Sequence, residues 1–499
     1  MAKSVAWQPP VPTPLLSDAS ITSLRGTLRQ ATARKWFHQA AICDWDKHGH
    51  RQQCCRLWLV GSASAGGLFV GAKRQQPRKR HTWCNAVGQG ELPLVNVEDT
   101  GDGRGRCLCA IRDVEAGEIL LTEAALFSTS EPEDEDQDCG ANDQRVVDLF
   151  SKLTRATKDA ILQLYCPAEP LPDSATREEG FNGEGLRFHR ILRVNGINLP
   201  TGCGGVFPTG SRANHSCRPN ALLRTSSDRL RIIAVRQVLA GEEVTVSYLS
   251  EDSLLQPTAE RRRRLEAWGF HCGCERCASA DDTRSLGCPT CAAGGSQGQV
   301  SPGDGGSWGP CRACGSSGTA ALLERCETDW LMRHESLPFL ECQVLYGVRN
   351  RRYAAGSAGR RETAPSGSGL EALTTLHTAL LDGSGTVEGS PAPVPGAHWL
   401  AAVFSDLAAE AHLWRGEAVA AIAAARSRRA FIRSTLGEAT LSREAAETLA
   451  TEAEGAMLAG DEAAASCLYQ EALDEALPLQ LEDDSLVLHI RGQLGAIQE

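Results

Sequence analysis

The spacing of its cysteines constrains the fold of this chain more than any other feature of the sequence. Four of the 20 cysteines, Cys288, Cys291, Cys311 and Cys314, follow the pattern C-x2-C-x19-C-x2-C. Each C-x2-C pair can hold one side of a tetrahedral zinc ion, while the glycine-rich interval forms a loop between the pairs. The pattern therefore predicts a structural zinc site.

A second group of cysteines lies just before the first. The stretch FHCGCERC contains Cys272, Cys274 and Cys277, which offer three thiolates within six residues. A closed structural zinc site needs four ligands, so a fourth has to come from elsewhere in the chain. We therefore expect a further zinc site here, whose last ligand is remote in the sequence.

Five further cysteines lie among apolar neighbours, where a cysteine usually acts as a small buried hydrophobe. They are Cys107, Cys109, Cys326, Cys342 and Cys467. We predict that these side chains pack in the interior.

Clustered metal-binding thiols suit a reducing compartment, and the composition agrees with an intracellular protein. The apolar fraction is 42%, and there is no run of about 18 apolar residues that could span a bilayer. The opening MAKSVAWQPPVPTP lacks the continuous apolar block of a secretory leader. We predict a protein of the cytoplasm, the nucleus or both, without a membrane partner.

Length and charge narrow the possibilities further. A chain of 499 residues exceeds what one hydrophobic core usually organises, which predicts two to four domains. The formal net charge of −11 gives no basic field overall, so we expect no strong binding of nucleic acid. The basic cluster KRQQPRKR at residues 73–80 fits a nuclear-import signal, a nucleic-acid patch or, most simply, solvated surface.

A nine-residue template occurs twice and predicts β structure. Residues 110–118 read AIRDVEAGE and residues 234–242 read AVRQVLAGE. Each copy follows an alternating stretch, turns at Gly117 or Gly241, where a positive φ is expected, and enters an apolar strand. Two such strand–turn–strand units predict a β fold of small sheets.

Helical patterns surround this β region. After an acidic linker at residues 131–138, helical spacing of apolar positions predicts an insertion; the positions are Val146, Leu149, Leu153, Ile161 and Leu164. Towards the C-terminus, segments 398–414, 416–436, 442–459 and 461–476 predict paired helices that turn at Gly416 and Gly460. Long helical hairpins of this kind are typical of tetratricopeptide-like (TPR-like) domains.

Two short motifs leave several interpretations open. The cluster GDGRGR at residues 101–106 is followed by a strand pattern, which excludes a Rossmann site because that site requires a helix. It fits a turn that lets the backbone approach a ligand, or an ordinary loop. The motif NHSC, Asn214 to Cys217, fits a thiolate nucleophile with its base, a metal ligand, a buried structural cysteine or a polar cofactor clasp.

Taken in order, these motifs resemble one known family. GRGRCLCAIRDVEAGE, RVNGINL, GSRANHSCRPN, GEEVTVSY and WGFHCGCERC follow one another as in a SET domain with its post-SET segment. The branch that the chain resembles is the SET/MYND (SMYD-like) protein lysine methyltransferases. In addition, CDWDKHGHRQQC at residues 43–54 resembles the closing turn of a MYND zinc finger, whose opening cysteine pairs are absent upstream.

The resemblance implies a multidomain α+β chain. Residues 1–90 are a poorly defined region with a degenerate MYND-like remnant, and residues 91–250 a split SET-domain β fold with its helical insertion near residues 140–190. Residues 251–278 are the post-SET zinc segment and residues 279–320 a second, zinc-ribbon-like segment. Residues 321–499 are an α-helical TPR-like domain that is expected to bind a partner peptide.

The resemblance also implies the site. Cys217 of NHSC joins Cys272, Cys274 and Cys277 around zinc, so that the chain holds two structural zinc ions. The residues implied to bind S-adenosylmethionine are Gly103, Arg104, Gly105, Asn195, Asn214, His215, Tyr248 and Phe270. Among them, Asn214 is implied to bind the amino-acid portion, while the backbone at His215 and the ring of Phe270 are implied to lie at the adenine. Tyr248 is also the implied catalytic residue, and Trp268 lines the substrate channel; without the resemblance, both aromatics also fit simple packing roles.

The implied function is methyl transfer from S-adenosylmethionine to the side-chain amine of a lysine in a protein substrate, histone or non-histone. The alternative is a catalytically inactive SET-derived scaffold that keeps the zinc sites and TPR-like helices for protein–protein interaction. The run of arginines 261–264 is expected to be a solvated helix face leading into the post-SET zinc site, rather than a nucleic-acid contact.

Overall fold

The computed structural model describes residues 93–128, 139–168, 178, 181–200, 204–303, 306–318, 320–336, 371, 374–375, 395–479 and 484–498. Four features singled out in the sequence lie outside these residues: the MYND-like stretch 43–54, the basic cluster 73–80, the acidic linker 131–138 and Cys342.

The first sheet has four strands and includes parts of two sequence motifs. Its order is β1 (Val95–Asp99), β2 (Arg106–Ala110), β10 (Glu243–Val246) and β7 (Asn214–His215). β1 and β10 run antiparallel to β2, whereas β7 runs parallel to β10, with Asn214 beside Thr245. The sheet therefore places the NHSC motif next to the strand that leads to Tyr248.

The two copies of the nine-residue template pair with each other. Val114 and Val238, the fifth residue of each copy, exchange both backbone hydrogen bonds at 2.9 Å. Both valine side chains are fully buried. Gly117 and Gly241 have φ values of +87° and +79°, which confirms the two predicted turns.

The pairing continues on both sides of these valines. The amide of Ala110 donates to the carbonyl of Glu242 at 3.0 Å, and the amide of Ala234 donates to the carbonyl of Glu118 at 2.9 Å. These residues occupy the first and ninth positions of the two copies. The copies are thus related by a local pseudo-twofold axis, so that equivalent positions in the sequence make equivalent contacts.

Two three-stranded sheets complete the β region and confirm the predicted fold of small sheets. One has the order β3 (Ile119–Ala124), β9 (Arg229–Ala234) and β8 (Ala221–Ser226). The other has the order β4 (Phe127–Ser128), β6 (Gly204–Val206) and β5 (Ile197–Asn198). Fully buried residues of the four-stranded sheet and of the β3–β9–β8 sheet share one core, which includes Leu108, Leu120, Ile232 and Val244.

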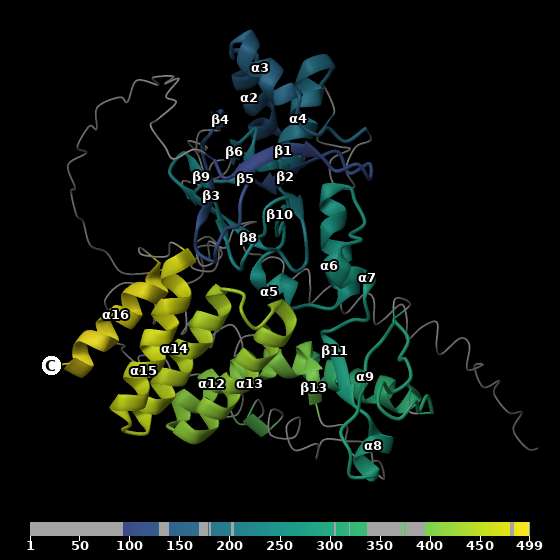
Figure 1. Ribbon diagram of the computed structural model, residues 1–499, viewed down its shortest axis with the longest axis vertical. Coiled ribbons are helices and arrows are strands. Elements are labelled where there is room, and N and C mark those ends of the chain that lie inside the picture. Colours follow the sequence, from purple (N-terminus) through teal and green to yellow (C-terminus); the bar gives the residue numbers. More distant parts are fainter. Residues whose placement is uncertain are drawn as a thin grey trace, which may run out of the picture. The chain divides into compact units, whose positions relative to one another are not determined.

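The predicted helical insertion consists of α2 (Cys139–Ser151), α3 (Arg155–Leu162) and α4 (Gly183–Asn195), which lie together at one end of the β region (Figure 1). Phe150 stacks on Phe188 with ring centroids 4.1 Å apart, which fixes α2 against α4. The apolar positions expected to face the core do so: Val146, Leu153, Ile161 and Leu164 are buried, and Leu149 is partly buried.

The chain after β10 carries both cysteine groups. The group at residues 272–277 lies among short helices, α5 (Glu251–Leu254), α6 (Thr258–Leu265), η3 (Glu266–Trp268) and α7 (Glu275–Ala278). The group at residues 288–314 is built on β11 (Arg284–Gly287), α8 (Pro289–Ala293) and β12 (Gln299–Val300). β11 pairs with β12 and also with β13 (Pro395–His398), and α9 (Ala320–Ser336) follows the second group.

The C-terminal part of the described chain is helical, as the sequence predicts. Its helices are α12 (Trp399–Arg415), α13 (Ala418–Leu436), α14 (Arg443–Leu458), α15 (Glu462–Ala476) and α16 (Ser485–Gln498). The bounds of the first four agree with the predicted segments within two residues, whereas the sequence patterns did not predict α16. Gly416 and Gly460, with φ values of +77° and +76°, form the turns that end α12 and separate α14 from α15.

The expectation of buried cysteines is confirmed for three side chains and wrong for one. Cys107, Cys109 and Cys326 are buried, whereas Cys467 is exposed. Cys467 lies on α15, whose core-facing positions are 465, 469, 472, 473 and 476. Position 467 falls outside that helical stripe, so its apolar neighbours in sequence do not cover it.

Asn220, at the end of NHSCRPN, joins the motif to β10. The side chain is 1% exposed, and its Oδ1 accepts the amide of Thr245 at 2.8 Å. Its Nδ2 donates to the carbonyl of Glu243 at 2.9 Å and to Oε1 of Glu242 at 3.0 Å. One buried amide group therefore supports the whole stretch that precedes Tyr248.

Replacing Asn220 by Asp should lower the free energy of unfolding by about 3 kcal/mol or more, because a buried carboxylate cannot donate and would face the Glu242 carboxylate. Asn96→Asp, on the exposed edge of β1, is the matched control and should change stability by less than about 0.5 kcal/mol. Urea unfolding of both variants measures the difference. Equal stabilities would show that Asn220 does not support β10.

Candidate functional site

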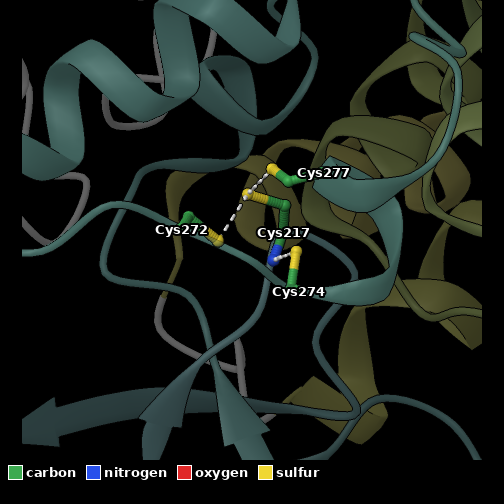
Figure 2. Close-up of side chains that lie close together, drawn as sticks. All are labelled: Cys217, Cys272, Cys274 and Cys277. Carbon is green, nitrogen blue, oxygen red and sulfur yellow. Dashed lines mark hydrogen bonds between the residues drawn. The ribbon is translucent and has the colours of Figure 1, made fainter. Parts of the chain in front are cut away.

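Four cysteines that are distant in sequence form one cluster of sulfur atoms (Figure 2). Sγ of Cys217 lies 3.5 Å from Sγ of Cys277 and 4.0 Å from Sγ of Cys272, while Sγ of Cys274 accepts the amide of Cys217 at 3.5 Å. All four sulfurs lie within 4.8 Å of one another, and three of the side chains are buried. The geometry suits a four-thiolate zinc site, and Cys217 is the ligand that the local sequence lacked.

Arginines surround this cluster instead of facing solvent. Arg261 is fully buried and places Nη2 3.7 Å from Sγ of Cys277. Arg262 donates to the carbonyls of Cys272 and Cys277 at 3.1 and 2.9 Å. The prediction of a solvated face is thus wrong for these two residues. Zinc with four thiolates carries a net negative charge, which nearby cations stabilise inside the protein.

Arg276 is a third cation at the cluster, and it is 4% exposed. Its Nη1 donates to the carbonyls of Cys217 and Leu254, both at 2.8 Å, and its Nε and Nη2 donate to Asp282. The guanidinium therefore links the backbone of Cys217, one member of the sulfur cluster, to Leu254 at the end of α5. The burial of Arg261 was not predicted because a charged run does not reveal which of its members is enclosed, and no sequence pattern singled out Arg276.

The histidine of NHSC bridges the sulfur cluster and the tyrosine. Nδ1 of His215 accepts the amide of Tyr248 at 3.0 Å, which requires Nδ1 to be unprotonated. In the neutral ring the proton is then on Nε2, which lies 3.2 Å from Sγ of Cys217 and donates to it. Burial lowers the pKa of His215 to about 4, so the ring is neutral. The His215 ring therefore directs no lone pair at Cys217. This argues against the interpretation of Cys217 as a nucleophile with His215 as its base.

The second cysteine group also closes into a cluster. Sγ of Cys288 lies 3.7 Å from that of Cys314, and Sγ of Cys291 lies 3.7 Å from that of Cys311. All four are within 4.8 Å of one another. Gly298 borders them closely: a Cβ there would overlap Sγ of Cys291 and lie 2.8 Å from Sγ of Cys311. The group can hold a zinc ion as the sequence predicts.

Four aromatic rings gather beside the first cluster. Tyr248 lies 5.9 Å from Trp268, 6.2 Å from Phe270 and 5.4 Å from His215, measured between ring centroids. The hydroxyl of Tyr248 donates to the carbonyl of Ala213 at 2.9 Å. Burial raises the pKa of Tyr248 to about 12, so the phenol is neutral at physiological pH. The structure thus unites the predicted catalytic tyrosine with the predicted channel and adenine residues.

The GRG motif forms a tight turn before β2. Gly103 and Gly105 have φ values of +85° and +93°, and the amide of Thr100 closes the turn on the carbonyl of Gly105 at 2.8 Å. Arg104 does not extend freely from this turn. Its Nε donates to Asp102 at 2.7 Å, and its two terminal nitrogens donate to Glu243 at 3.1 and 2.9 Å. These hydrogen bonds, that with Glu243 foremost, raise the pKa of Arg104.

Glu243 links this turn to the NHSC motif. Its Oε1 also accepts Nδ2 of Asn214 at 2.8 Å, and the same Nδ2 lies 3.4 Å from the carbonyl of Arg106. Because both neighbours are acceptors, the amide nitrogen must face them, which leaves Oδ1 of Asn214 for another partner. Sequence analysis assigned no role to Glu243, although it stands in GEEVTVSY, five residues before Tyr248.

Asn195, the last residue of the helical insertion, contacts the segment that precedes the NHSC motif. It is 8% exposed at the end of α4, and its Nδ2 donates to the carbonyls of Tyr165 and Ile191, both at 2.8 Å. Its own carbonyl accepts Oγ of Ser211 at 3.1 Å. Ser211 lies in η2 (Gly210–Arg212), three residues before Asn214, so Asn195 adjoins the segment that leads into NHSC.

Glu123 is a second residue that sequence analysis missed. From the end of β3 its carboxylate accepts the amides of Thr209 and Gly210 at 2.9 and 2.7 Å, which holds the start of η2. Burial raises the pKa of Glu123. A Cβ at Gly210 would overlap Leu230, so only glycine fits beneath this carboxylate. The partners are 86 and 87 residues away in sequence, which no local pattern signals.

Comparisons with known proteins agree on one part of the chain. The family profile described as SET domain matches residues 105–249. Histone-lysine N-methyltransferase SMYD3 of Mus musculus is 40% identical over 146 residues, which are 26% of this chain and 32% of that protein. N-lysine methyltransferase SMYD2 of Homo sapiens is 35% identical over 81 residues, or 16% of this chain and 18% of that protein.

The matched regions thus span a third or less of these relatives. A crystal structure of the SET domain of LSMT bound to lysine and AdoHcy shows a distant likeness, with a TM-score of 0.26 and 14% identity, covering 70% of this chain and 88% of that one. The assignment therefore rests on the matched sequence and on the motifs inside it. Residues 105–249 match the SET domain family, and part of the chain is similar to SMYD-type lysine methyltransferases.

Proposed function

We propose that this protein is an S-adenosylmethionine-dependent protein-lysine N-methyltransferase. The observation that carries the proposal is the position of one segment, residues 213–217, which adjoins three features at once. Its Asn214 shares Glu243 with the GRG turn, its Ala213 carbonyl binds the Tyr248 hydroxyl, and its Cys217 lies in a four-thiolate cluster. Each contact alone would also stabilise a scaffold, but a cofactor and a substrate amine need all three features next to one another.

The chain's residues fit the needs of methyl transfer. S-adenosylmethionine supplies an activated methyl group, so the protein has mainly to orient and desolvate the reactants. The Tyr248 hydroxyl donates to Ala213, which leaves oxygen lone pairs that can accept a hydrogen from a neutral lysine amine. Burial between Tyr248 and Trp268 disfavours the charged form of a lysine, which lowers its pKa.

The proposal also includes the predicted substrate and the predicted binding partner. The substrate is a protein lysine, and the helices from α12 onward are proposed to bind a partner peptide. Among the described helices, none is long and apolar enough to span a bilayer. Location in the nucleus or cytoplasm, and the expectation of no strong nucleic-acid binding, remain predictions from the sequence.

We expect the purified protein to bind two zinc ions, because eight cysteines close two four-thiolate clusters. Cys217→Ala should release one zinc and destabilise the segment at residues 272–277. Gly298→Ala should affect only the other cluster, since its new Cβ meets Cys291 and Cys311. Elemental analysis of the three proteins measures this. A Cys217→Ala variant that retains two zinc ions would contradict the ligand assignment.

Cofactor binding distinguishes the proposed enzyme from an inactive scaffold. S-adenosylmethionine should raise the melting temperature, because a ligand that binds only the native state stabilises it. Asn214→Ala should greatly reduce this shift without releasing zinc, since its proposed contact is to the cofactor. Asn96→Ala, on the exposed edge strand, is the control and should keep the full shift. Absence of any shift at saturating cofactor would favour the scaffold.

Removing one oxygen from Tyr248 tests its catalytic role. Tyr248→Phe keeps the ring among its aromatic neighbours, so zinc content and most cofactor binding should persist while methyl transfer falls about tenfold or more. A tyrosine with only a packing role predicts the reverse, a stability loss of about 1 kcal/mol with unchanged activity per folded molecule. Single-turnover rates and melting temperatures from one preparation decide between them.

A further inference from the structure

Two arginines adjoin the predicted cofactor residues. Arg106 directly follows Gly105 at the start of β2, and Arg212 ends η2 two residues before Asn214. Nδ2 of Asn214 lies 3.4 Å from the carbonyl of Arg106, and β2 is in contact with η2. Both arginines therefore border the asparagine that is proposed to bind the amino-acid end of S-adenosylmethionine.

Neither guanidinium has an ion-pair partner among the described residues. Arg106 donates from Nη2 to the carbonyl of Gln163 at 3.1 Å, and Arg212 donates from Nε to the carbonyl of Pro208 at 2.9 Å. The carboxylate that acts on Arg212 from a distance, Glu123, already accepts two amides of the η2 segment. Burial and the charge of Arg106 lower the pKa of Arg212, so the two cations oppose each other.

The hydrogen-bond donors of Arg104 and Asn214, the two other polar side chains considered for this place, are largely engaged with other partners. Arg104 uses Nε and both terminal nitrogens on Asp102 and Glu243. Asn214 turns its nitrogen towards Glu243, which leaves an oxygen that can accept but not donate. An acceptor beside Glu243 suits the ammonium group of a bound amino acid. The carboxylate of the same amino acid needs donors, and Arg104 has few to offer.

We propose that Arg106 and Arg212 bind the carboxylate of the methionine part of S-adenosylmethionine. This inference rests on the proposed function, and it assigns the carboxylate to a pair of arginines outside the GRG turn. An anion between two like charges relieves their repulsion and makes charge-assisted hydrogen bonds to both guanidinium groups. The pair would thus recognise the amino-acid end of the cofactor, which is separate from both the reacting methyl group and the adenosine.

The test compares three ligands that differ at this end: S-adenosylmethionine, its decarboxylated form and 5′-methylthioadenosine, which lacks the amino-acid part. Calorimetry on the zinc-loaded protein should show the first bound about 10- to 100-fold more tightly than the second. Arg212→Gln and Arg106→Gln, which remove the charge but keep an amide donor, should each bring this ratio closer to one. Their affinity for 5′-methylthioadenosine should stay within about twofold of wild type.

Arg187→Gln is the matched control. Arg187 donates to the carbonyl of Leu162, in the same segment that Arg106 contacts at Gln163, but lies on α4. It should keep the wild-type preference for the carboxylate. This control separates loss of an anion contact from loosening of the segment at residues 162–166.

Each other outcome overturns the inference in a recognisable way. If wild type binds S-adenosylmethionine but does not prefer it to the decarboxylated form, the carboxylate has no arginine partner and the proposed function still stands. If the arginine variants change only the KM for a protein substrate, the pair belongs to the substrate. If wild type binds none of the three ligands, the proposed function fails together with this assignment.

Discussion

The clustering of Cys217 with three cysteines more than fifty residues later is the constraint on which the site depends. It fastens residues 272–277 to the end of β7, and this brings Phe270 and Trp268 against Tyr248. His215 adds a second link, because one ring nitrogen binds the Tyr248 amide and the other binds the Cys217 sulfur. Thiolates repel one another, so a zinc ion bound among these four sulfurs would stabilise the arrangement. The aromatic site and the sulfur cluster are therefore one structural unit.

A second constraint is the pairing of the two nine-residue templates, which provides a rigid frame with local twofold symmetry. The contacts of Val114 with Val238 are reciprocal, but the strands that leave the two copies differ. The first copy leads into β3, in which Glu123 is the second-last residue, and the second leads into β10, which begins at Glu243. Each glutamate then holds one part of the candidate site, so a symmetric frame supports an asymmetric centre.

Much of this organisation could be predicted because it depends on local patterns. Cysteine spacing predicted one complete zinc cluster and three ligands of the other, whose fourth ligand, Cys217, was implied only by the family resemblance. Glycine turns and helical periodicity predicted the hairpins and four of the C-terminal helices. What could not be predicted depends on distant contacts. Glu243 meets Arg104 across 139 residues, and the buried Arg261 contacts the sulfur of Cys277, 16 residues away. Cys467 shows the reverse: its neighbours are apolar, yet its angle on α15 leaves it exposed. The residues next to a side chain in the sequence do not determine whether it is buried. Its position on the helix face and its contacts with remote segments determine that.

The hydrogen bond of Tyr248 to Ala213 joins the structural and catalytic interpretations of this residue. Donation to a buried carbonyl satisfies the hydroxyl, as a packing role requires, and it also fixes the directions of the oxygen lone pairs. A hydroxyl that donated to water could rotate, whereas this one presents its acceptor side in a constant direction. With its pKa raised to about 12 by burial, the phenol remains neutral over the range in which a lysine amine loses its proton. The tyrosine can therefore orient a neutral amine without exchanging protons with it. The Ala213 carbonyl that enforces this lies between Arg212 and Asn214, so the same short segment sets the geometry at both ends of the cofactor that we propose it binds.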